Sequence, residues 1–224
     1  MTTRLYLIRH GATAASTEDR FSGSVDIELS DEGRFQAAAL GQRLADDRIA
    51  AICASPMQRT LATAALVGKP HGLTPIPYED LKEINHGHWE HMRRVEVEAQ
   101  FADEYVAWEA DPFTFAPQGG ESGLSVLARA LPIIRNLVVT HPDQNVAVVS
   151  HKATIRLLIS SLLGFDPRGY RDRLDMAPAC LNVLDFKDPV RCRLMLFNDV
   201  SHYVDQPRRD TARLSKWWDA PTVS

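Results

Sequence analysis

The sequence predicts an α/β fold, a three-layer sandwich with a mostly parallel central sheet and helices on both faces. Short apolar runs typical of strands alternate with helical segments over most of the 224 residues, and this alternation is the pattern of a parallel sheet. Polar residues suited to catalysis follow directly after two of the predicted strands. Open parallel sheets bind ligands at the carboxyl ends of their strands, so the fold class also predicts where the site lies.

The first half of the chain contains three predicted strands and two predicted helices. Ser30 caps the first helix, which runs to about Asp47. The residues expected on one face of this helix are Phe35, Ala38, Ala39 and Leu44. Ser55-Pro56 opens the second helix, because proline is favoured near the first turn. Pro75 and Pro77 confine the third strand to a sheet edge. The predicted strands are Arg4–Arg9, Ile49–Ala54 and Leu73–Tyr78.

The second half begins with a stretch that interrupts the alternation. Residues 86–120 contain a polar helix candidate, Val95–Ala110, and the loop DPFTFAPQGG. A long helix capped by Ser122 follows and reaches Thr140. Gly164 ends the next helix. The remaining predicted strands are Asn145–Ser150 and a hairpin formed by Leu181–Phe186 and Cys192–Phe197.

This order of elements predicts a single domain over residues 1–204. A lid is inserted at about residues 86–120, and a polar C-terminal tail covers residues 205–224. The tail is polar apart from Trp217-Trp218, which makes this pair a candidate contact in a homodimer.

Composition is that of an ordinary globular protein, with 45% hydrophobic and 24% charged residues. The formal net charge of -4 argues against general nucleic-acid binding. The start of the chain lacks the apolar core of a secretory signal, and the apolar segment Ile155–Phe165 is too short to cross a bilayer. Three widely spaced cysteines fit reduced thiols. We therefore expect a cytoplasmic protein that binds neither nucleic acid nor membrane.

The triplet Arg9-His10-Gly11, at the end of the first strand, carries the most chemical information. Arginine offers a bidentate fork to phosphate oxygens, and imidazole is nucleophilic near neutral pH. Gly11 lets the backbone turn sharply and approach a ligand closely. Phosphoryl transfer requires a cationic cradle, an in-line nucleophile and an acid for the leaving oxygen. The triplet therefore predicts phosphoryl transfer through the protein's own histidine, without a metal.

Three further segments supply the remaining groups. They are Ser55-Pro56-Met57-Gln58-Arg59-Thr60, Leu81-Lys82-Glu83-Ile84 with His86-Gly87-His88-Trp89-Glu90, and Val149-Ser150-His151. In this order after Arg9-His10-Gly11, they resemble the histidine phosphatase superfamily, also called the phosphoglycerate mutase-like proteins. The resemblance extends over roughly residues 5–202. It includes Arg20-Phe21-Ser22-Gly23, Leu29-Ser30-Asp31-Glu32-Gly33, Gly120-Glu121-Ser122 and Asn198-Asp199-Val200-Ser201-His202.

The resemblance implies a role for each catalytic residue and a phosphoglycerate mutase-like sandwich. His10 would attack phosphorus and carry a phosphohistidine. The phosphoryl oxygens would be held by Arg9, Arg59 and His151. Glu83 would protonate the leaving oxygen and then take a proton from the attacking water. Neighbouring arginines favour the neutral imidazole that such an attack needs, and no metal or other cofactor is implied.

A second set of residues is expected to bind substrate. Its members are Gly11, Thr13, Ser16, Ser22, Gly23, His86, Lys152 and His202. Lys152 departs from the family pattern, because many relatives have glycine after the histidine that His151 matches. A cation at a helix N-terminus opposes the helix dipole, and a bound anion would offset this cost. We therefore expect Lys152 to meet a substrate carboxylate or a second phosphate.

Water is the expected phosphoryl acceptor. The segment typical of the mutases, rich in tyrosine, asparagine and lysine, is absent after Glu83, and residues 86–120 are more similar to metal-independent phosphoserine and small-metabolite phosphatases. The expected substrate is thus a small phosphorylated metabolite, and phosphoserine is one candidate. The alternative to hydrolysis is mutase-type phosphoryl transfer by the same site. Candidates for selectivity in the insertion are Trp89, Arg93, Arg94, Trp108, Phe113 and Phe115.

Two other classes remain open. The run His86-Gly87-His88-Trp89-Glu90-His91 is close to the HxHxDH signature of metallo-β-lactamase-like hydrolases, with His141 or His151 and His202 as further metal ligands. That fold needs strand-rich sequence before the motif, whereas helices precede it here. A non-catalytic protein that binds a phosphorylated metabolite or protein is the third class, and the complete set of catalytic residues argues against it.

Overall fold

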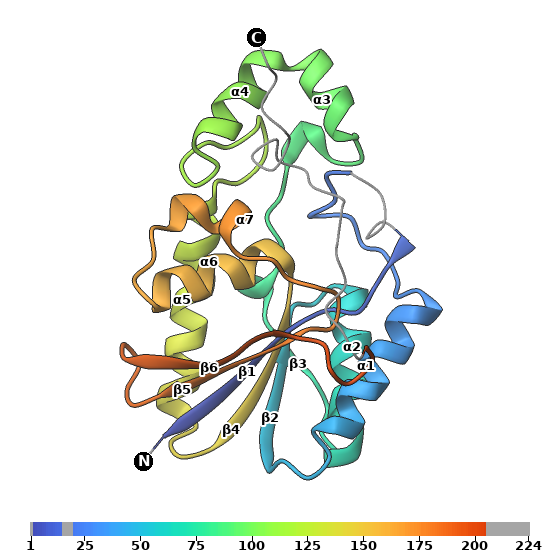
Figure 1. Cartoon of the computed structure of the whole chain (residues 1–224), viewed down its shortest axis with the longest axis vertical. Helices are drawn as coiled ribbons and strands as arrows, with labels where there is room; N and C mark the ends of the chain where they lie inside the picture. Colours follow the sequence, from blue (N-terminus) through green and yellow to red (C-terminus); the bar gives the residue numbers. More distant parts are fainter. Residues whose placement is uncertain (1, 15–19, 205–224) are drawn as a thin grey trace.

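The computed structural model of the chain describes residues 2–14 and 20–204. Six strands form one sheet in the order β3-β2-β4-β1-β5-β6 (Figure 1). Strands β1 to β4 are mutually parallel where they pair, and β5 and β6 join as an antiparallel hairpin. The strands are β1 (Thr3–Arg9), β2 (Ile49–Ala54), β3 (Ile76–Pro77), β4 (Asn145–Ser150), β5 (Leu181–Phe186) and β6 (Cys192–Asp199). The predicted α/β sandwich with a mostly parallel sheet is confirmed.

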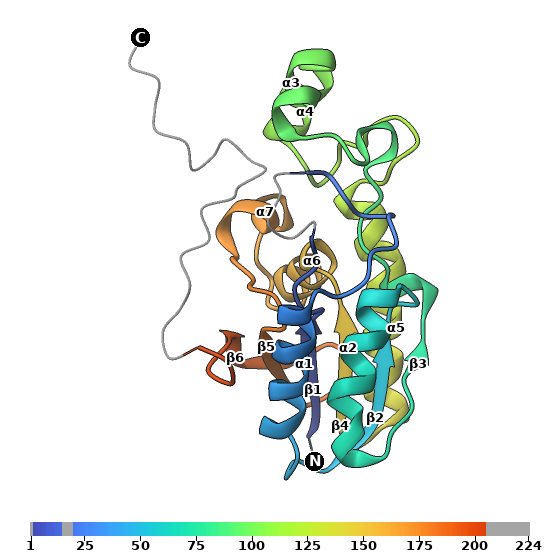
Figure 2. The same ribbon diagram turned by 90° about the vertical axis from the view of Figure 1, so that its right-hand side faces the viewer.

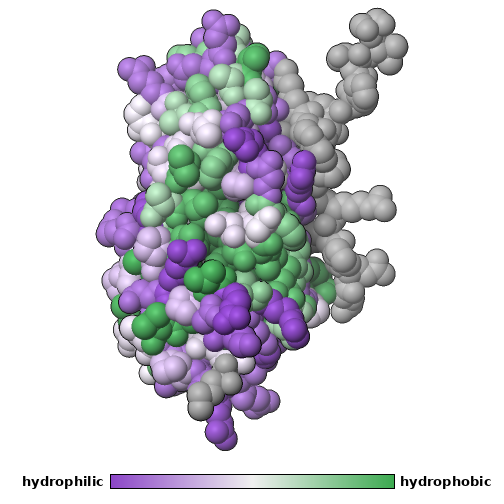
Figure 3. All heavy atoms as spheres, turned by 90° about the vertical axis from the view of Figure 1, so that its left-hand side faces the viewer, coloured by the Kyte–Doolittle hydropathy of each residue, from purple (hydrophilic) through white to green (hydrophobic). Residues whose placement is uncertain are grey.

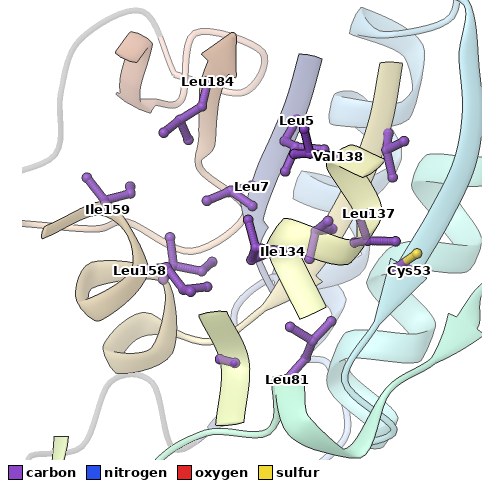
Figure 4. Close-up of a cluster of buried hydrophobic side chains, with 14 of the residues drawn as sticks. Leu5, Leu7, Cys53, Leu81, Ile134, Leu137, Val138, Leu158, Ile159 and Leu184 are labelled. Atoms are coloured by element: carbon purple, nitrogen blue, oxygen red, sulfur yellow. The ribbon is translucent and has the colours of Figure 1, made fainter. Parts of the chain in front are cut away.

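Helices cover both faces of this sheet (Figures 1 and 2). They are α1 (Asp31–Arg43), α2 (Gln58–Gly68), α3 (Arg94–Gln100), α4 (Ala102–Ala110), α5 (Gly123–Thr140), α6 (Lys152–Leu162) and α7 (Tyr170–Arg173). Successive side chains of β1 point to opposite faces of the sheet, so they contribute to two separate hydrophobic cores. Leu5 and Leu7 pack with α5 and α6, as Figure 4 shows, whereas Tyr6 and Ile8 pack with α1 and α2.

Helix α1 buries a different face from the predicted one. Phe35 is 64% exposed, whereas the buried residues are Gly33, Gln36, Ala37, Leu40 and Gly41. A Cβ atom at Gly41 would lie 2.6 Å from the backbone oxygen of Leu66, and one at Gly33 would lie 2.1 Å from that of Ala12. Close backbone contact therefore selects glycine for the inner face, and the large aromatic side chain faces outward.

The predicted helix Val95–Ala110 is two helices. The backbone leaves the helical region at Phe101, which separates α3 from α4. A separate hydrophobic cluster lies between these helices and the rest of the insertion, formed by Phe21, Trp89, Val97, Tyr105 and Trp108. Trp89 and Trp108 are 0% and 3% exposed. They form the core of the insertion, so these two candidates for selectivity have mainly a packing role.

Helix α5 is 18 residues long with a mean hydropathy of 1.4, so length and composition alone would allow it to cross a membrane. Its buried residues include Val126, Ala130, Ile134 and Leu137, and Figure 4 shows Ile134 and Leu137 in one cluster with Leu7 of β1 and Leu158 of α6. The apolar character of α5 is therefore explained by its place in the core.

The side of the molecule that carries β5, β6 and α6 is apolar at mid-height (Figure 3). The large exposed hydrophobic residues of this region are Phe165, Val190 and Met195. All three cysteines are unpaired, and Cys53 and Cys180 are buried. Trp217 and Trp218 lie outside the described residues.

Candidate active site

Three adjacent strands end at the same level and deliver the candidate catalytic residues. Arg9 of β1 pairs with Ser150 of β4, and Ala54 of β2 pairs with Val149. Backbone hydrogen bonds continue past the strand ends, because the N–H of His10 donates to Ser150 O at 3.0 Å and that of Ser55 donates to Val149 O at 3.0 Å. His10, Ser55 and His151 are thus brought to one edge of the sheet, as the parallel topology predicts.

His10 is held in the form that a nucleophile requires. Its Nδ1 lies 2.8 Å from Gly11 O, and a carbonyl oxygen only accepts, so Nδ1 carries the proton and Nε2 keeps its lone pair. The residue is 7% exposed. Burial first, and then the charges of Arg9 and Arg59, hold its pKa well below the usual value. The imidazole is therefore neutral at pH 7 and has a fixed tautomer.

His151 forms a second fixed imidazole beside the first. Arg59 Nε donates to His151 Nδ1 at 3.3 Å, so Nε2 carries the proton and donates to Ser55 Oγ at 2.8 Å. The rings of His10 and His151 have centroids 5.3 Å apart and meet edge to face. Burial, Arg59 and His10 hold the pKa of His151 well below its usual value. Sequence reasoning gave Ser55 only as a helix start, although its place directly after a strand was the available signal.

Two buried arginines surround His10. Arg9 is 8% exposed, its Nη1 donates to Met176 O at 2.5 Å, and its buried Nε has no partner within residues 2–14 and 20–204. Arg59 is 4% exposed and donates to Val25 O at 2.6 Å and to Gly23 O at 3.0 Å. Burial lowers the pKa of Arg59, and nearby Glu83 counteracts this most. Buried cations with donors to spare form a suitable cradle for the oxygens of a phosphoryl group.

Glu83 lies at the N-terminus of α6. Its carboxylate accepts hydrogen bonds from Ile84 N (3.0 Å), Ala153 N (3.0 Å), Thr154 N (3.1 Å) and Thr154 Oγ1 (3.1 Å). Helix N-termini stabilise such acceptors. Since α6 begins directly after His151, the same helix positions both residues at the site.

The predicted substrate residues that lie before Glu83 have mainly backbone roles. Gly11 donates to Thr63 Oγ1, and a Cβ there would lie 2.4 Å from Gly33 O. The backbone at Gly11 thus lies close to the first turn of α1, and its predicted contact with substrate stays a prediction. A Cβ at Gly23 would lie 1.6 Å from Ile84 O, which places this loop against the Glu83 segment. Thr13 is buried in an isolated bridge with Leu29, Ser22 is half-buried, and Ser16 lies outside the described residues.

The three remaining predicted substrate residues, His86, Lys152 and His202, have different surroundings. His86 is 8% exposed, its Nδ1 has no partner, and its ring lies edge to face on Phe21. Lys152 is the first residue of α6 and follows His151. His202 lies 3.5 Å from Arg43 and packs on Tyr203. The expectation that His202 reaches the site stays a prediction.

A metal centre in the histidine-rich run is not assembled. His86 packs on Phe21, His88 Nε2 lies 2.9 Å from Glu104, and His91 is exposed with a φ of 71°. Across residues 2–14 and 20–204, no three His, Cys, Asp or Glu side chains form a group that could hold a metal ion. Glu90 instead accepts backbone hydrogen bonds from Gly23, Ser24 and His86, and so joins the two loops.

A cavity of about 670 Å³ opens beside Glu83. Its lining residues are Gly23, Ser24, Asp26, Pro56, Met57, Glu79, Lys82, Glu83, Asn85, Glu121 and Arg129. The cavity thus borders the residue proposed to serve the leaving group.

The buried histidines predict that the protein loses stability in acid. His10, His86, His151 and His202 all have pKa values below normal because of burial, with that of His202 lowered to about 4. An unfolded histidine has a pKa near 6.5, so below that pH the unfolded chain takes up protons that the folded chain excludes. Stability is therefore complete above about pH 6.5 and falls towards pH 4. We expect melting temperatures to decrease over this range and His202→Gln to reduce the slope; an unchanged slope would contradict the prediction for His202.

Fold and site together define an enzyme of phosphoryl transfer with a histidine nucleophile. The family model described as "Histidine phosphatase superfamily (branch 1)" matches residues 5–200. The chain belongs to this superfamily, and it is a hydrolase of the phosphatase type, consistent with its named relatives.

Those relatives are phosphatases. Phosphoserine phosphatase 1 of Hydrogenobacter thermophilus is 33% identical over 163 residues, covering 73% of this chain and 77% of that protein. Glucosyl-3-phosphoglycerate phosphatase of Mycolicibacterium vanbaalenii is 36% identical over 169 residues, covering 72% and 74%. Among solved structures, Bacillus stearothermophilus YhfR has a TM-score of 0.83 at 30% identity and covers 89% of this chain and 98% of its own.

Proposed function

We propose that the protein hydrolyses phosphomonoesters of small metabolites through a phosphohistidine on His10. The observation that carries this proposal is the neutral imidazole of His10, with Nδ1 bonded to Gly11 O and Nε2 free, between two buried arginines. Its neighbours Arg9 and Arg59 supply the donors that a transferring phosphoryl group requires, and His151 orients Arg59 by accepting from its Nε.

In the first step, Nε2 of His10 attacks phosphorus while the bond from phosphorus to the ester oxygen breaks. Negative charge develops on the phosphoryl and leaving oxygens. Arg9 and Arg59 stabilise the charge on the phosphoryl group, and the protonated carboxyl of Glu83 gives its proton to the leaving oxygen. The products of this step are the free alcohol and a phosphohistidine.

In the second step, water attacks phosphorus from the side that the alcohol has left. The Glu83 carboxylate takes a proton from this water as the P–O bond forms and the P–N bond breaks. Inorganic phosphate leaves, and His10 returns to its neutral form. Each proton that Glu83 gives in the first step is thus recovered in the second.

The substrate we propose is a small phosphorylated metabolite, with phosphoserine among the first compounds to test. Two relatives are named as phosphatases of phosphoserine and of glucosyl-3-phosphoglycerate. We also propose that the protein acts in the cytoplasm, for which its three unpaired cysteines are the supporting observation.

Treatment with EDTA is expected to leave the phosphatase activity unchanged, because every group in this mechanism belongs to the protein chain. Brief incubation with labelled substrate and rapid quenching should trap a phosphoenzyme that is labile in acid and stable in base, as expected of a phosphoramidate. Activity that is lost with EDTA and restored by added metal would support the metal-dependent alternative instead.

A further inference from the structure

A third buried arginine, Arg156, lies outside the set of residues that sequence reasoning assigned to the site. Arg156 is the fifth residue of α6 and is 7% exposed. Its Nη2 lies 3.5 Å from Asp175 Oδ1, and its Nε is buried without a partner among the described residues. Burying a guanidinium with so few hydrogen bonds is costly, and a ligand that supplies acceptors would offset this cost.

Arg156 is close to the phosphate cradle. It reaches Asp175, while Arg9 donates to Met176 O, so two guanidinium groups meet consecutive residues of one segment. Glu83 binds backbone N–H groups in the preceding turn of α6. Burial lowers the pKa of Arg156 to about 10, and the charges of Arg9 and Glu83 act on it as well. At neutral pH the group is therefore a cation within the electrostatic reach of two site residues.

We propose that Arg156 binds a carboxylate in the leaving portion of the substrate, so that the enzyme prefers phosphomonoesters of hydroxy or amino acids. This inference rests on the proposed function. A guanidinium fork matches a carboxylate in plane and spacing. The side chain of Asp175 is 40% exposed, and its Oδ1 lies 3.5 Å from Arg156 Nη2. This single long contact leaves other N–H groups of Arg156 available. Lys152, one turn earlier on α6, places a second positive charge near the same end of the helix.

Kinetics with matched substrates test this subsite. O-phosphoserine carries a carboxylate that O-phosphoethanolamine lacks, whereas the two share the phosphoester and the amine. We expect Arg156→Met to raise the KM for phosphoserine about 10- to 100-fold and that for phosphoethanolamine less than about threefold, as suits one charge-assisted hydrogen bond. Arg156→Lys should recover part of the loss. An equal change in KM for both substrates, or no change in either, overturns the proposal. If a sugar bisphosphate is assayed as well, an Arg156→Met effect confined to that substrate also overturns it.

Binding measurements separate this proposal from the proposed function. In the His10→Ala background, calorimetry should show that Arg156→Met weakens phosphoserine binding and leaves phosphoethanolamine binding nearly unchanged. If the wild type hydrolyses no phosphomonoester, the proposed function fails, and calorimetry still decides whether Arg156 recognises a carboxylate. Melting temperatures show whether Arg156→Met folds. If it does not fold, Arg156→Lys is used to compare the binding of phosphoserine and phosphoethanolamine.

An independent observation concerns Arg129 of α5, which holds the backbone around Glu83. Its Nη1 donates to Asp80 O at 2.7 Å and Lys82 O at 2.8 Å, and its Nη2 donates to Glu83 O at 3.1 Å. The same guanidinium forms a bidentate pair with Glu121, whose Oε2 accepts from Asn85 N at 3.1 Å. The Arg129–Glu121 pair therefore fixes the backbone on both sides of Glu83.

We infer that Arg129 is a positioning residue for the general acid, again on the basis of the proposed function. Its loss would leave His10 and the phosphate cradle in place and displace the carboxyl of Glu83. Proton transfer tolerates little displacement, because the acid must lie within hydrogen-bond reach of the leaving oxygen. The effect should therefore depend on how much the leaving group needs a proton.

Substrates with different leaving groups test this role. We expect Arg129→Met to lower kcat/KM, which reports formation of the phosphoenzyme, about 10-fold or more for an alkyl phosphate and less than about threefold for p-nitrophenyl phosphate, whose leaving group needs no acid. Adding Glu83→Gln to Arg129→Met should cause little more loss than Glu83→Gln alone. Arg135→Met, at an exposed position of the same helix, is the matched control. Equal losses with both substrates would show a general structural role and overturn the inference.

Discussion

Replacing His10 with alanine is expected to reduce kcat by about 10⁴-fold or more, because the phosphoryl group then has no covalent acceptor. The cradle of Arg9, Arg59 and His151 remains, so substrate binding should change much less than turnover. Steady-state kinetics with the preferred substrate measure the loss, and a rapid-quench assay should no longer trap a phosphoenzyme. Alanine leaves a small void in a buried position, so the fold should be retained.

His141→Ala is the matched control for this experiment. His141 follows α5 and bonds to Gln144, so it lies at the opposite end of the sheet from the site and should not affect activity. Circular dichroism and melting temperature show whether each variant is folded. If folded His10→Ala retained a substantial part of the wild-type kcat, the phosphohistidine mechanism would be wrong.

Replacing Glu83 with glutamine is expected to have the next largest effect, and its size should depend on the substrate. Glutamine keeps the shape of the side chain and its acceptor oxygen, but cannot give or take the proton. General acid catalysis contributes about 10²- to 10⁴-fold, so kcat for an alkyl phosphate should fall within this range. The loss of kcat/KM with p-nitrophenyl phosphate, which reports formation of the phosphoenzyme alone, should be far smaller.

Phosphoenzyme accumulation gives a second measurement for Glu83→Gln. With p-nitrophenyl phosphate the first step needs no acid, whereas hydrolysis of the phosphohistidine still needs a base. A burst of p-nitrophenol followed by slow turnover is therefore expected. An equal loss with both substrates and no burst would exclude Glu83 as the proton donor, and Glu90 would then be the next carboxylate to test.

Many boundaries of the fold could be predicted because their signals are local. Ser30 and Ser122 each accept a hydrogen bond from the backbone three residues later, as N-cap residues do. Gly164 has a φ of 71° and follows α6, which is the conformation that favours glycine after a helix. Apolar runs such as Asn145–Ser150 form buried strands of the sheet. Each of these signals depends on neighbours within a few residues.

Other features depended on contacts that no local pattern contains. The inner face of α1 follows from the approach of Gly33 to Ala12 and of Gly41 to Leu66, so an apolar residue at position 35 faces outward. The division between α3 and α4, and the burial of Trp89 and Trp108, follow from a cluster that includes Phe21 from outside the insertion. Aromatic residues in a polar segment therefore could not be assigned to core or to substrate contact beforehand.

By itself, the sequence determined the α/β class, the residues that meet at the carboxyl ends of the strands, and membership of the histidine phosphatase superfamily. Side chains that follow adjacent parallel strands must come together, so His10 and His151 could be placed from local strand signals alone. Only the tertiary structure decided which nitrogen of His10 carries the proton, how Ser55 fixes His151, and that Arg129 holds the backbone of Glu83 while Arg156 is buried beside Asp175. These properties depend on burial and on hydrogen bonds between residues far apart in the chain, and such distances arise only when the chain is folded.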